Sequence, residues 1–185
     1  MTANTFVAAP IENTKGWLSQ YLIKLPDALR VFDARDLHLT VAFLGKISAE
    51  AQHAVIRILE QLSHPAFEIS FDRLVALPNA KRMSAISLRV KDGASEAARF
   101  IETWREPIFQ SVALPPETRP PLPHITIARP KRNATAREKN TILNWCNAET
   151  PPSVTIPINR VALYTWSDNR KERQFKILYE KSLQV

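Results

Sequence analysis

Hydrophobic and polar residues follow two periods along the chain, which indicates a mixture of strands and helices. Alternation with a period of two, typical of a half-buried strand, is clearest at 37–44, just before Gly45. The other segments with strand character are 4–9, 67–77, 84–90, 124–128, 153–165 and 174–180. Apolar residues at helical spacing predict helices over 11–25, 48–62, 95–112 and 135–147. Strands and helices interspersed in this way favour an α+β fold.

Two local signals refine this pattern. Ser48 precedes the second helical segment and is expected to be its N-cap. The proline-dense stretch 114–123, LPPETRPPLP, is expected to be an extended connector.

Length and composition restrict the class of protein. The chain has 185 residues, which suits one compact domain or two closely packed lobes. No apolar run reaches the roughly 18 residues that cross a bilayer, and the opening MTANTFVAAPIENTKG does not resemble a signal peptide. Three glycines exclude a glycine-rich phosphate loop, and the single Cys146 excludes an internal disulfide. We therefore expect a cytoplasmic monomer with no membrane association.

The charge balance is strongly basic. Lys and Arg total 25 against 18 Asp and Glu, which gives a net charge of +7 and an isoelectric point near 9.8. Such an excess attracts polyanions, including nucleic acids, but it also serves solubility. The charge therefore fits two interpretations equally well: a nucleotide or RNA partner, or solubility alone.

A short internal repeat carries the chemical information. Residues 38–42 read HLTVA and residues 124–128 read HITIA, both within predicted strands. Because strand side chains alternate between faces, His38 and Thr40 share one face, as do His124 and Thr126. Each strand therefore presents an imidazole and a hydroxyl roughly 7 Å apart, backed by aliphatic residues on the other face.

If the two strands lie side by side, the two imidazoles and two hydroxyls converge. Two histidines can divide the roles of general acid and general base near neutral pH. The hydroxyls can donate hydrogen bonds to phosphoryl oxygens. This set can break a phosphoester without a metal or any other cofactor, and a zinc hydrolase is disfavoured because no carboxylate ligand accompanies the histidines.

The sequences around the repeat resemble a known family. The segments DLHLTVAFLG, PHITIAR and ALYTWSDNRKERQFKILYEKSL are similar to the 2H phosphoesterase superfamily, and within it to RNA 2′,3′-cyclic phosphodiesterases, long called 2′-5′ RNA ligases. The resemblance implies one domain over 1–185, with an α+β bilobal fold: two pseudo-symmetric lobes, antiparallel sheets and a central cleft. It implies hydrolysis of 2′,3′-cyclic phosphates on RNA ends or nucleotides to 2′-phosphates, with reverse 2′-5′ ligation and neither metal nor ATP.

The resemblance also implies roles for six residues. His38 would protonate the departing 3′ oxygen, and His124 would activate water. Thr40, Thr126 and Arg129 would bind phosphate, and Phe43 would stack on the base. In a straight strand Phe43 and Arg129 would point away from the histidines, so these two roles require a strand end or a bulge. In the family, the segment before the first motif more often contains an Arg-Trp pair, which the segment RVFDARDLH lacks. Arg30 and Arg35 could supply the positive charge instead.

Other functions fit the same motifs. The chain could cleave 2′-5′ linked oligonucleotides or a small cyclic nucleotide, or it could be a non-catalytic RNA-binding module. His53 and His64 have no repeated partner and are expected to be structural. Cys146 is expected to be a buried, inert residue in a helix.

Overall fold

The computed structural model describes residues 3–12 and 16–184 of the chain. Its strands are β1 (Asn4–Pro10), β2 (Leu29–Val31), β3 (His38–Lys46), β4 (Phe67–Ile69), β5 (Phe71–Leu77), β6 (Ala85–Val90), β7 (His124–Pro130), β8 (Ile156–Ile158), β9 (Arg160–Trp166) and β10 (Phe175–Ser182). Its helices are α1 (Trp17–Tyr21), α2 (Ala49–Gln61), α3 (Ala94–Ser111) and α4 (Ala136–Ala148), with short 3-10 turns η2 (Leu22–Lys24) and η3 (Ala34–Asp36).

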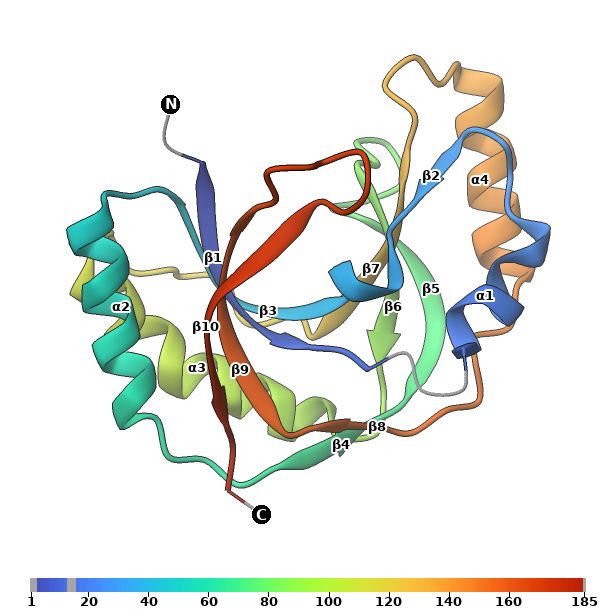
Figure 1. Cartoon of the computed structure of the whole chain (residues 1–185). Helices are drawn as coiled ribbons and strands as arrows, with labels where there is room; N and C mark the ends of the chain where they lie inside the picture. The colour runs from blue at the N-terminus through green and yellow to red at the C-terminus, as the bar shows by residue number, and fades with distance from the viewer. Residues whose placement is uncertain (1–2, 13–15, 185) are drawn as a thin grey trace.

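One antiparallel sheet runs through the whole molecule (Figure 1). Its strand order is β10-β9-β1-β3-β7-β6-β5, and β2 pairs with β7 at one end of that strand. The centre of the sheet is the contact between β3 and β7, which carry the two His-x-Thr segments. A second, two-stranded sheet is formed by β4 and β8. The α+β fold with antiparallel sheets predicted from the sequence is confirmed.

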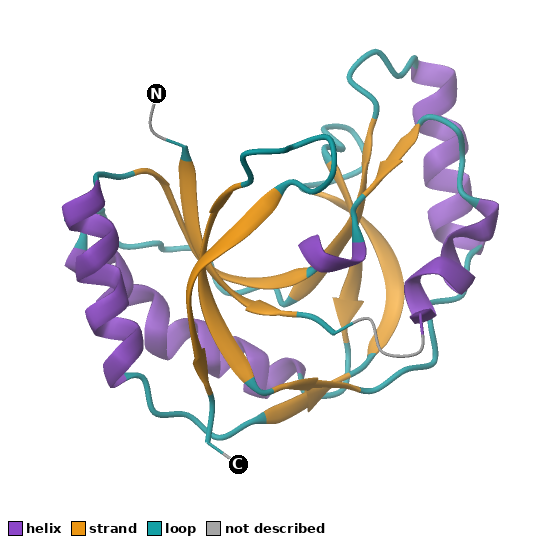
Figure 2. Ribbon diagram, viewed as in Figure 1, coloured by secondary structure: helices purple, strands orange, loops and turns teal. Residues whose placement is uncertain are grey.

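Helices pack on both halves of this sheet (Figure 2). α3 packs against β3 and α2, whereas α4 packs against β5 on the other side of the molecule. Each His-x-Thr strand leads into a 13-residue helix with a hydroxyl N-cap. As predicted, Ser48 caps α2 by accepting a hydrogen bond from the Ala51 amide. Thr135 caps α4 in a capping box with Glu138. The two halves therefore repeat one strand–helix unit.

Two predicted strands are each split into two, for the same reason. The segment 67–77 forms β4 and β5, which are separated at Ser70, and 153–165 contains β8 and β9, which are separated at Asn159. β4 and β8 pair with each other, whereas β5 and β9 belong to the large sheet. The chain thus changes sheets at Ser70 and Asn159, which hydrophobic patterning does not report.

The predicted helix over 11–25 is wrong over much of its length. Ile11 and Glu12 are not helical, and residues 13–15 lie outside the described residues. Helix begins only after Gly16, whose φ of 67° is a left-handed conformation that interrupts a helix. The three-residue strand β2 is not among the predicted elements, because its pattern is too short to show alternation. No helix in the described ranges is long and apolar enough to span a bilayer.

Candidate active site

The two His-x-Thr segments meet in the centre of the sheet. Leu39 of β3 pairs with Ile125 of β7 in antiparallel register, and both side chains are buried in the main core. Because antiparallel strands run in opposite directions, this register sets His38 beside Thr126 and Thr40 beside His124. The four polar side chains are half-buried on the face opposite the aliphatic core. The convergence that the repeat predicted is thus present.

A bulge follows the threonine in each strand. In the pairing of β1 with β3, Ala8 faces Thr40 but Val7 faces Ala42, so Val41 is an extra residue in β3. In the pairing of β6 with β7, Ile127 is the extra residue at the equivalent place. An extra residue shifts the alternation of side chains by one position. Beyond each bulge, the side chains that would have faced the core in a straight strand face the histidines instead.

The bulge places Phe43 on the histidine face. Phe43 is 58% exposed and lies opposite Phe6 of β1. The Phe6 ring in turn lies 4.8 Å from the His38 ring, measured between centroids. In a straight β3, Phe43 would point away from the histidines; the bulge turns it to their side of the sheet.

Arg129 comes to the same face through the bulge in β7. It pairs with Arg30 of β2, and its guanidinium carbon lies 5.6 Å from the centre of the Phe32 ring. Packing around the guanidinium lowers the pKa of Arg129 from its ordinary value, and the charge of Arg30 lowers it further. Of the two cations expected to approach the first motif, Arg30 is therefore beside the site, whereas Arg35 forms ion pairs with Asp33 and Glu172.

Both histidines are oriented in the same way by the main chain. Nδ1–H of His38 donates to the carbonyl of Asp36 over 2.6 Å, and Nδ1–H of His124 donates to the carbonyl of Leu122 over 2.6 Å. Because a carbonyl oxygen only accepts, these bonds assign the proton of each neutral ring to Nδ1. Nε2 of each ring has no hydrogen-bond partner among the described residues and is left to exchange a proton with a ligand.

Aromatic rings surround His38. The rings of Phe6, Phe175 and Tyr164 lie 4.8, 5.5 and 5.8 Å from the His38 ring, with Phe175 edge-on. Burial among them lowers the pKa of His38 to about 4, and the charges of His124 and Arg129 act in the same direction. His124 and Arg129 therefore lie close enough to His38 to disfavour its protonation.

The surroundings of His124 are more polar. It lies opposite Arg89 of β6, and in the described part of the chain no aromatic ring packs on it. Two residues further along β7, Thr126 Oγ1 lies 3.1 Å from Ser87 Oγ of β6, a hydrogen bond that no sequence pattern indicates. Burial lowers the pKa of His124 as well, opposed by its bond to the Leu122 carbonyl. Both imidazoles are therefore neutral in the free protein at neutral pH.

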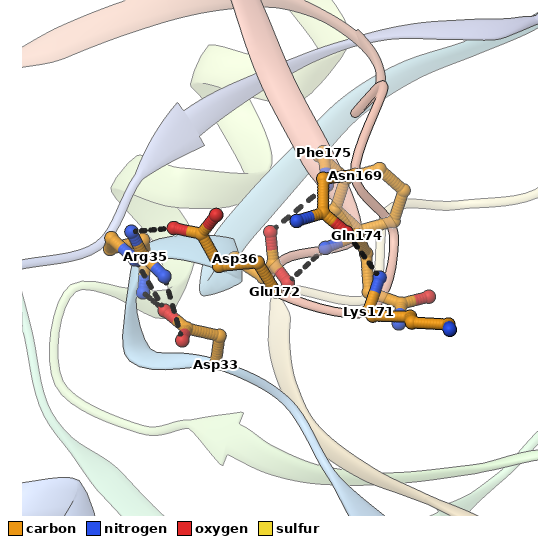
Figure 3. Close-up of polar contacts among 8 residues, drawn as sticks. All are labelled: Asp33, Arg35, Asp36, Asn169, Lys171, Glu172, Gln174 and Phe175. Atoms are coloured by element: carbon orange, nitrogen blue, oxygen red, sulfur yellow. Dashed lines mark hydrogen bonds and ion pairs between the residues drawn. The ribbon is translucent and has the colours of Figure 1, made fainter.

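A buried carboxylate fixes the loop beside His38 (Figure 3). Asp36 is 1% exposed, and its carboxylate accepts hydrogen bonds from the amides of Gln174 and Phe175 over 2.6 and 3.0 Å. These amides stand where the β9–β10 loop enters β10 and hold the Phe175 ring against His38. Burial raises the pKa of Asp36, and the two amide bonds oppose that rise.

Other residues singled out in the sequence lie elsewhere. His64 is buried against Phe100 and bonds to the carbonyl of Pro65, in a structural setting away from the motifs. Cys146 is buried in α4, and burial raises its pKa to about 11. Within residues 3–12 and 16–184, no three His, Cys, Asp or Glu side chains are grouped as a metal site.

Solved structures share this architecture. Escherichia coli LigT complexed with 3′-AMP matches all of this chain and all of its own, with a TM-score of 0.73 and 22% identity. The protein TT0787 of Thermus thermophilus matches 97% of each chain, with a TM-score of 0.72 and 20% identity. The fold is that of the LigT-type 2H phosphoesterases.

Sequence comparisons define the family. The model of the 2′-5′ RNA ligase superfamily matches residues 18–170. A protein of E. coli K12 named RNA 2′,3′-cyclic phosphodiesterase is 30% identical over 131 residues, which cover 68% of each chain. A relative of the same name from Aeropyrum pernix is 29% identical over 103 residues, 56% of this chain and 58% of its own. The chain belongs to the 2′-5′ RNA ligase superfamily, as the sequence motifs predicted.

Proposed function

We propose that this protein hydrolyses 2′,3′-cyclic phosphates on RNA ends and nucleotides to 2′-phosphates, without a metal, and that it can also join RNA ends reversibly through a 2′-5′ linkage. The observation that carries the proposal is the antiparallel pairing of the two His-x-Thr segments. It sets two imidazoles with available Nε2 atoms and two hydroxyls on one face of the sheet. Relatives named RNA 2′,3′-cyclic phosphodiesterase support the same reaction.

In the proposed reaction, each histidine moves one proton. Nε2 of His124 takes a proton from water as the water oxygen forms a bond to phosphorus. The bond between phosphorus and the 3′ oxygen breaks, and Nε2–H of His38 gives its proton to that oxygen. The products are a 2′-phosphate and a 3′-hydroxyl. His38 and His124 then regain their starting states by exchanging protons with solvent. In ligation, the 5′-hydroxyl of a second RNA takes the place of water. Its proton goes to Nε2 of His124, its oxygen bonds to phosphorus, and the 3′ oxygen leaves with the proton of His38, which yields a 2′-5′ phosphodiester.

The remaining residues hold the substrate. Thr40 and Thr126 donate hydrogen bonds to the two non-bridging oxygens, and Arg129 neutralises their charge. The exposed ring of Phe43 stacks on the terminal base. LigT, which shares the fold, has been crystallised with 3′-AMP, with ATP and with phosphate, and these ligands suit a site of this composition.

The substrate also promotes the required protonation. Burial keeps both histidines neutral in the free site, whereas general acid catalysis needs one imidazolium. A cyclic phosphate diester is an anion, and an opposite charge nearby raises the pKa of an imidazole. Binding therefore favours the singly protonated pair.

The test is hydrolysis of a short RNA that ends in a 2′,3′-cyclic phosphate, in excess EDTA, by the wild type and by His124→Ala. His53→Ala, which removes an exposed histidine of α2, is the matched control. We expect the wild type and the control to release a 2′-phosphate and His124→Ala to release it at least about 100-fold more slowly. A 3′-phosphate product, dependence on a metal, or RNA binding without turnover would overturn the proposal.

A further inference from the structure

A basic groove adjoins the candidate active site. It has a volume of about 540 Å³, and Arg30 of β2 and Arg129 at the end of β7 line it beside the histidine face. Lys131 and Arg132, in the turn after β7, and Lys139 of α4 complete its cationic wall. No carboxylate is among the lining residues in the described part of the chain. A cleft lined by charges of one sign raises the local concentration of ligands of the opposite sign, so this lining indicates an anionic ligand.

These cations are not neutralised within the protein. Elsewhere, arginines such as Arg89 and Arg160 form ion pairs with Asp or Glu. Among the described residues, none of the five groove cations forms one. Lys131 does act on one acidic group, Glu138, but the pKa of Glu138 is lowered mainly by its hydrogen bonds to Thr135 at the start of α4 and only secondarily by the charge of Lys131.

Two of the cations directly oppose each other. Arg30 and Arg129 occupy paired positions on adjacent strands, where like charges repel. After burial, the charge of Arg30 is the second cause that lowers the pKa of Arg129, as expected of a like charge close by. An anion bound between them would relieve it.

The groove and the catalytic face are continuous through Arg129. This residue lines the groove, and its charge reaches His38. At the other end of the face, the exposed Phe43 ring lies on the His124 side, since Thr40 is beside His124 in the strand register. A basic groove and an exposed aromatic ring at the two ends of one site are the features with which proteins bind single-stranded nucleic acid.

We propose that this groove binds the phosphate backbone of an RNA strand whose cyclic phosphate end lies between the two His-x-Thr pairs, so that the preferred substrate is an oligonucleotide and not a mononucleotide. The inference rests on the proposed function and extends it to substrate length. It favours RNA over an acidic protein, because the groove continues from a site suited to a phosphodiester.

The experiment compares two triple variants. The groove variant is Lys131→Gln, Arg132→Gln and Lys139→Gln. The control variant, Lys46→Gln, Arg57→Gln and Lys91→Gln, removes the same charge from exposed positions outside the groove. Arg57 stands on α2, on the opposite side of the molecule from α4 (Figure 1). Turnover is measured with 2′,3′-cyclic AMP and with an RNA of about six nucleotides that ends in a cyclic phosphate.

We expect the wild type and the control to prefer the oligonucleotide by at least about tenfold in kcat/KM, and the groove variant to lose most of that preference. A binding measurement is independent of turnover: the affinity for the same RNA ending in a 2′-phosphate is followed against salt concentration. The salt slope is the steepness with which the logarithm of the binding constant falls with the logarithm of salt concentration. Each phosphate neutralised in single-stranded RNA adds about 0.7 to this steepness, so the loss of three cations should reduce it by about 2 in the groove variant.

The outcomes separate the two proposals. If the wild type turns over both substrates equally, or if the groove variant keeps the preference and the salt slope, the groove does not bind the strand, while the proposed function stands. If neither substrate is hydrolysed, the proposed function fails. In that case the binding measurement alone tests the groove: a smaller salt slope in the groove variant than in the control variant supports RNA binding there, and equal slopes contradict it.

Discussion

The two His-x-Thr half-sites have the same backbone and different surroundings. In both, Nδ1–H of the histidine donates to the carbonyl two residues earlier, and a bulge follows the threonine. The residue that provides that carbonyl is Asp36 in the first half-site, with a buried carboxylate, and Leu122 in the second, with a side chain that is 50% exposed. The motif therefore determines how each imidazole is oriented, while residues outside the motif determine its environment.

This difference changes the electrostatics of the pair. Through Asp36, the first half-site holds the β9–β10 loop, and the Phe175 ring packs against His38. The second half-site holds its threonine through Ser87 instead. The two half-sites are therefore asymmetric. Burial among aromatic rings lowers the pKa of His38 to about 4, so His38 stays neutral until the pH falls to that value. The following variants test whether this asymmetry matters for the reaction.

The largest effect is expected from the histidines themselves. His38→Asn and His124→Asn should each reduce kcat at least about 100-fold, because each removes a positioned acid or base. The double variant should lose little more than either single one, since the two groups act as a unit. Single-turnover rates with a cyclic-phosphate RNA measure this. A single variant with wild-type turnover would show that only one half-site is catalytic.

The threonines should have the next largest effect. Thr40→Val and Thr126→Val keep the side-chain shape and remove a hydroxyl that donates to a charged oxygen. The loss should be about 10- to 100-fold in kcat/KM. Ser87→Ala is the matched probe of the second half-site, because it removes only the partner of the Thr126 hydroxyl. We expect a smaller loss from it, and a loss equal to that of Thr126→Val would mean that Thr126 acts through Ser87.

The asymmetry itself is tested at Asp36. In the wild type, each carboxylate oxygen of Asp36 accepts a hydrogen bond from one loop amide. Asp36→Asn replaces one of these oxygens with an NH2 group, so one hydrogen bond is lost and the loop and Phe175 should pack less closely on His38. The pKa of His38 should then rise from about 4 towards its ordinary value of 6.5. Titration of the imidazole signals by NMR measures it. Arg35→Gln, which breaks an exposed ion pair to Glu172 of the same loop, is the control and should leave that pKa unchanged.

The smallest effect concerns stability. The pKa of His38 is about 4 in the folded protein and near 6.5 in the unfolded chain, so the unfolded chain binds more protons between these values. This contribution is therefore fully present above pH 6.5 and is lost as the pH falls towards 4. Urea unfolding at about pH 7 and about pH 5 should show a smaller loss of stability for His38→Gln than for the wild type. An equal loss in both proteins would mean that His38 is not held neutral by the fold.

The sequence predicts which residues come together at this site better than it predicts their detailed geometry. The repeat identifies His38, Thr40, His124 and Thr126, because alternation along a strand requires only local spacing. The bulges that bring Phe43 and Arg129 to the histidine face could not be predicted. Their extra residues, at positions 41 and 127, are an ordinary valine and isoleucine with no glycine beside them.

Long-range contacts set a second limit. The role of Asp36 depends on amides 138 and 139 residues further along the chain, so no local pattern could reveal it. The division of 67–77 and 153–165 into separate strands likewise depends on how distant segments pair. The N-cap at Ser48, by contrast, is a contact with an amide three residues later, and the local pattern predicts it correctly.

The most direct test of the account is the pH dependence of kcat/KM for the wild type and for the two histidine variants. The wild type should give a bell-shaped profile with its maximum on the acid side of pH 6.5, because burial lowers the pKa of both histidines. The residual activity of His38→Asn should rise with pH to a plateau, and that of His124→Asn should only fall as pH rises. A bell that persists in either variant, or a wild-type rate that climbs steadily through about pH 9, would contradict a histidine pair acting as acid and base.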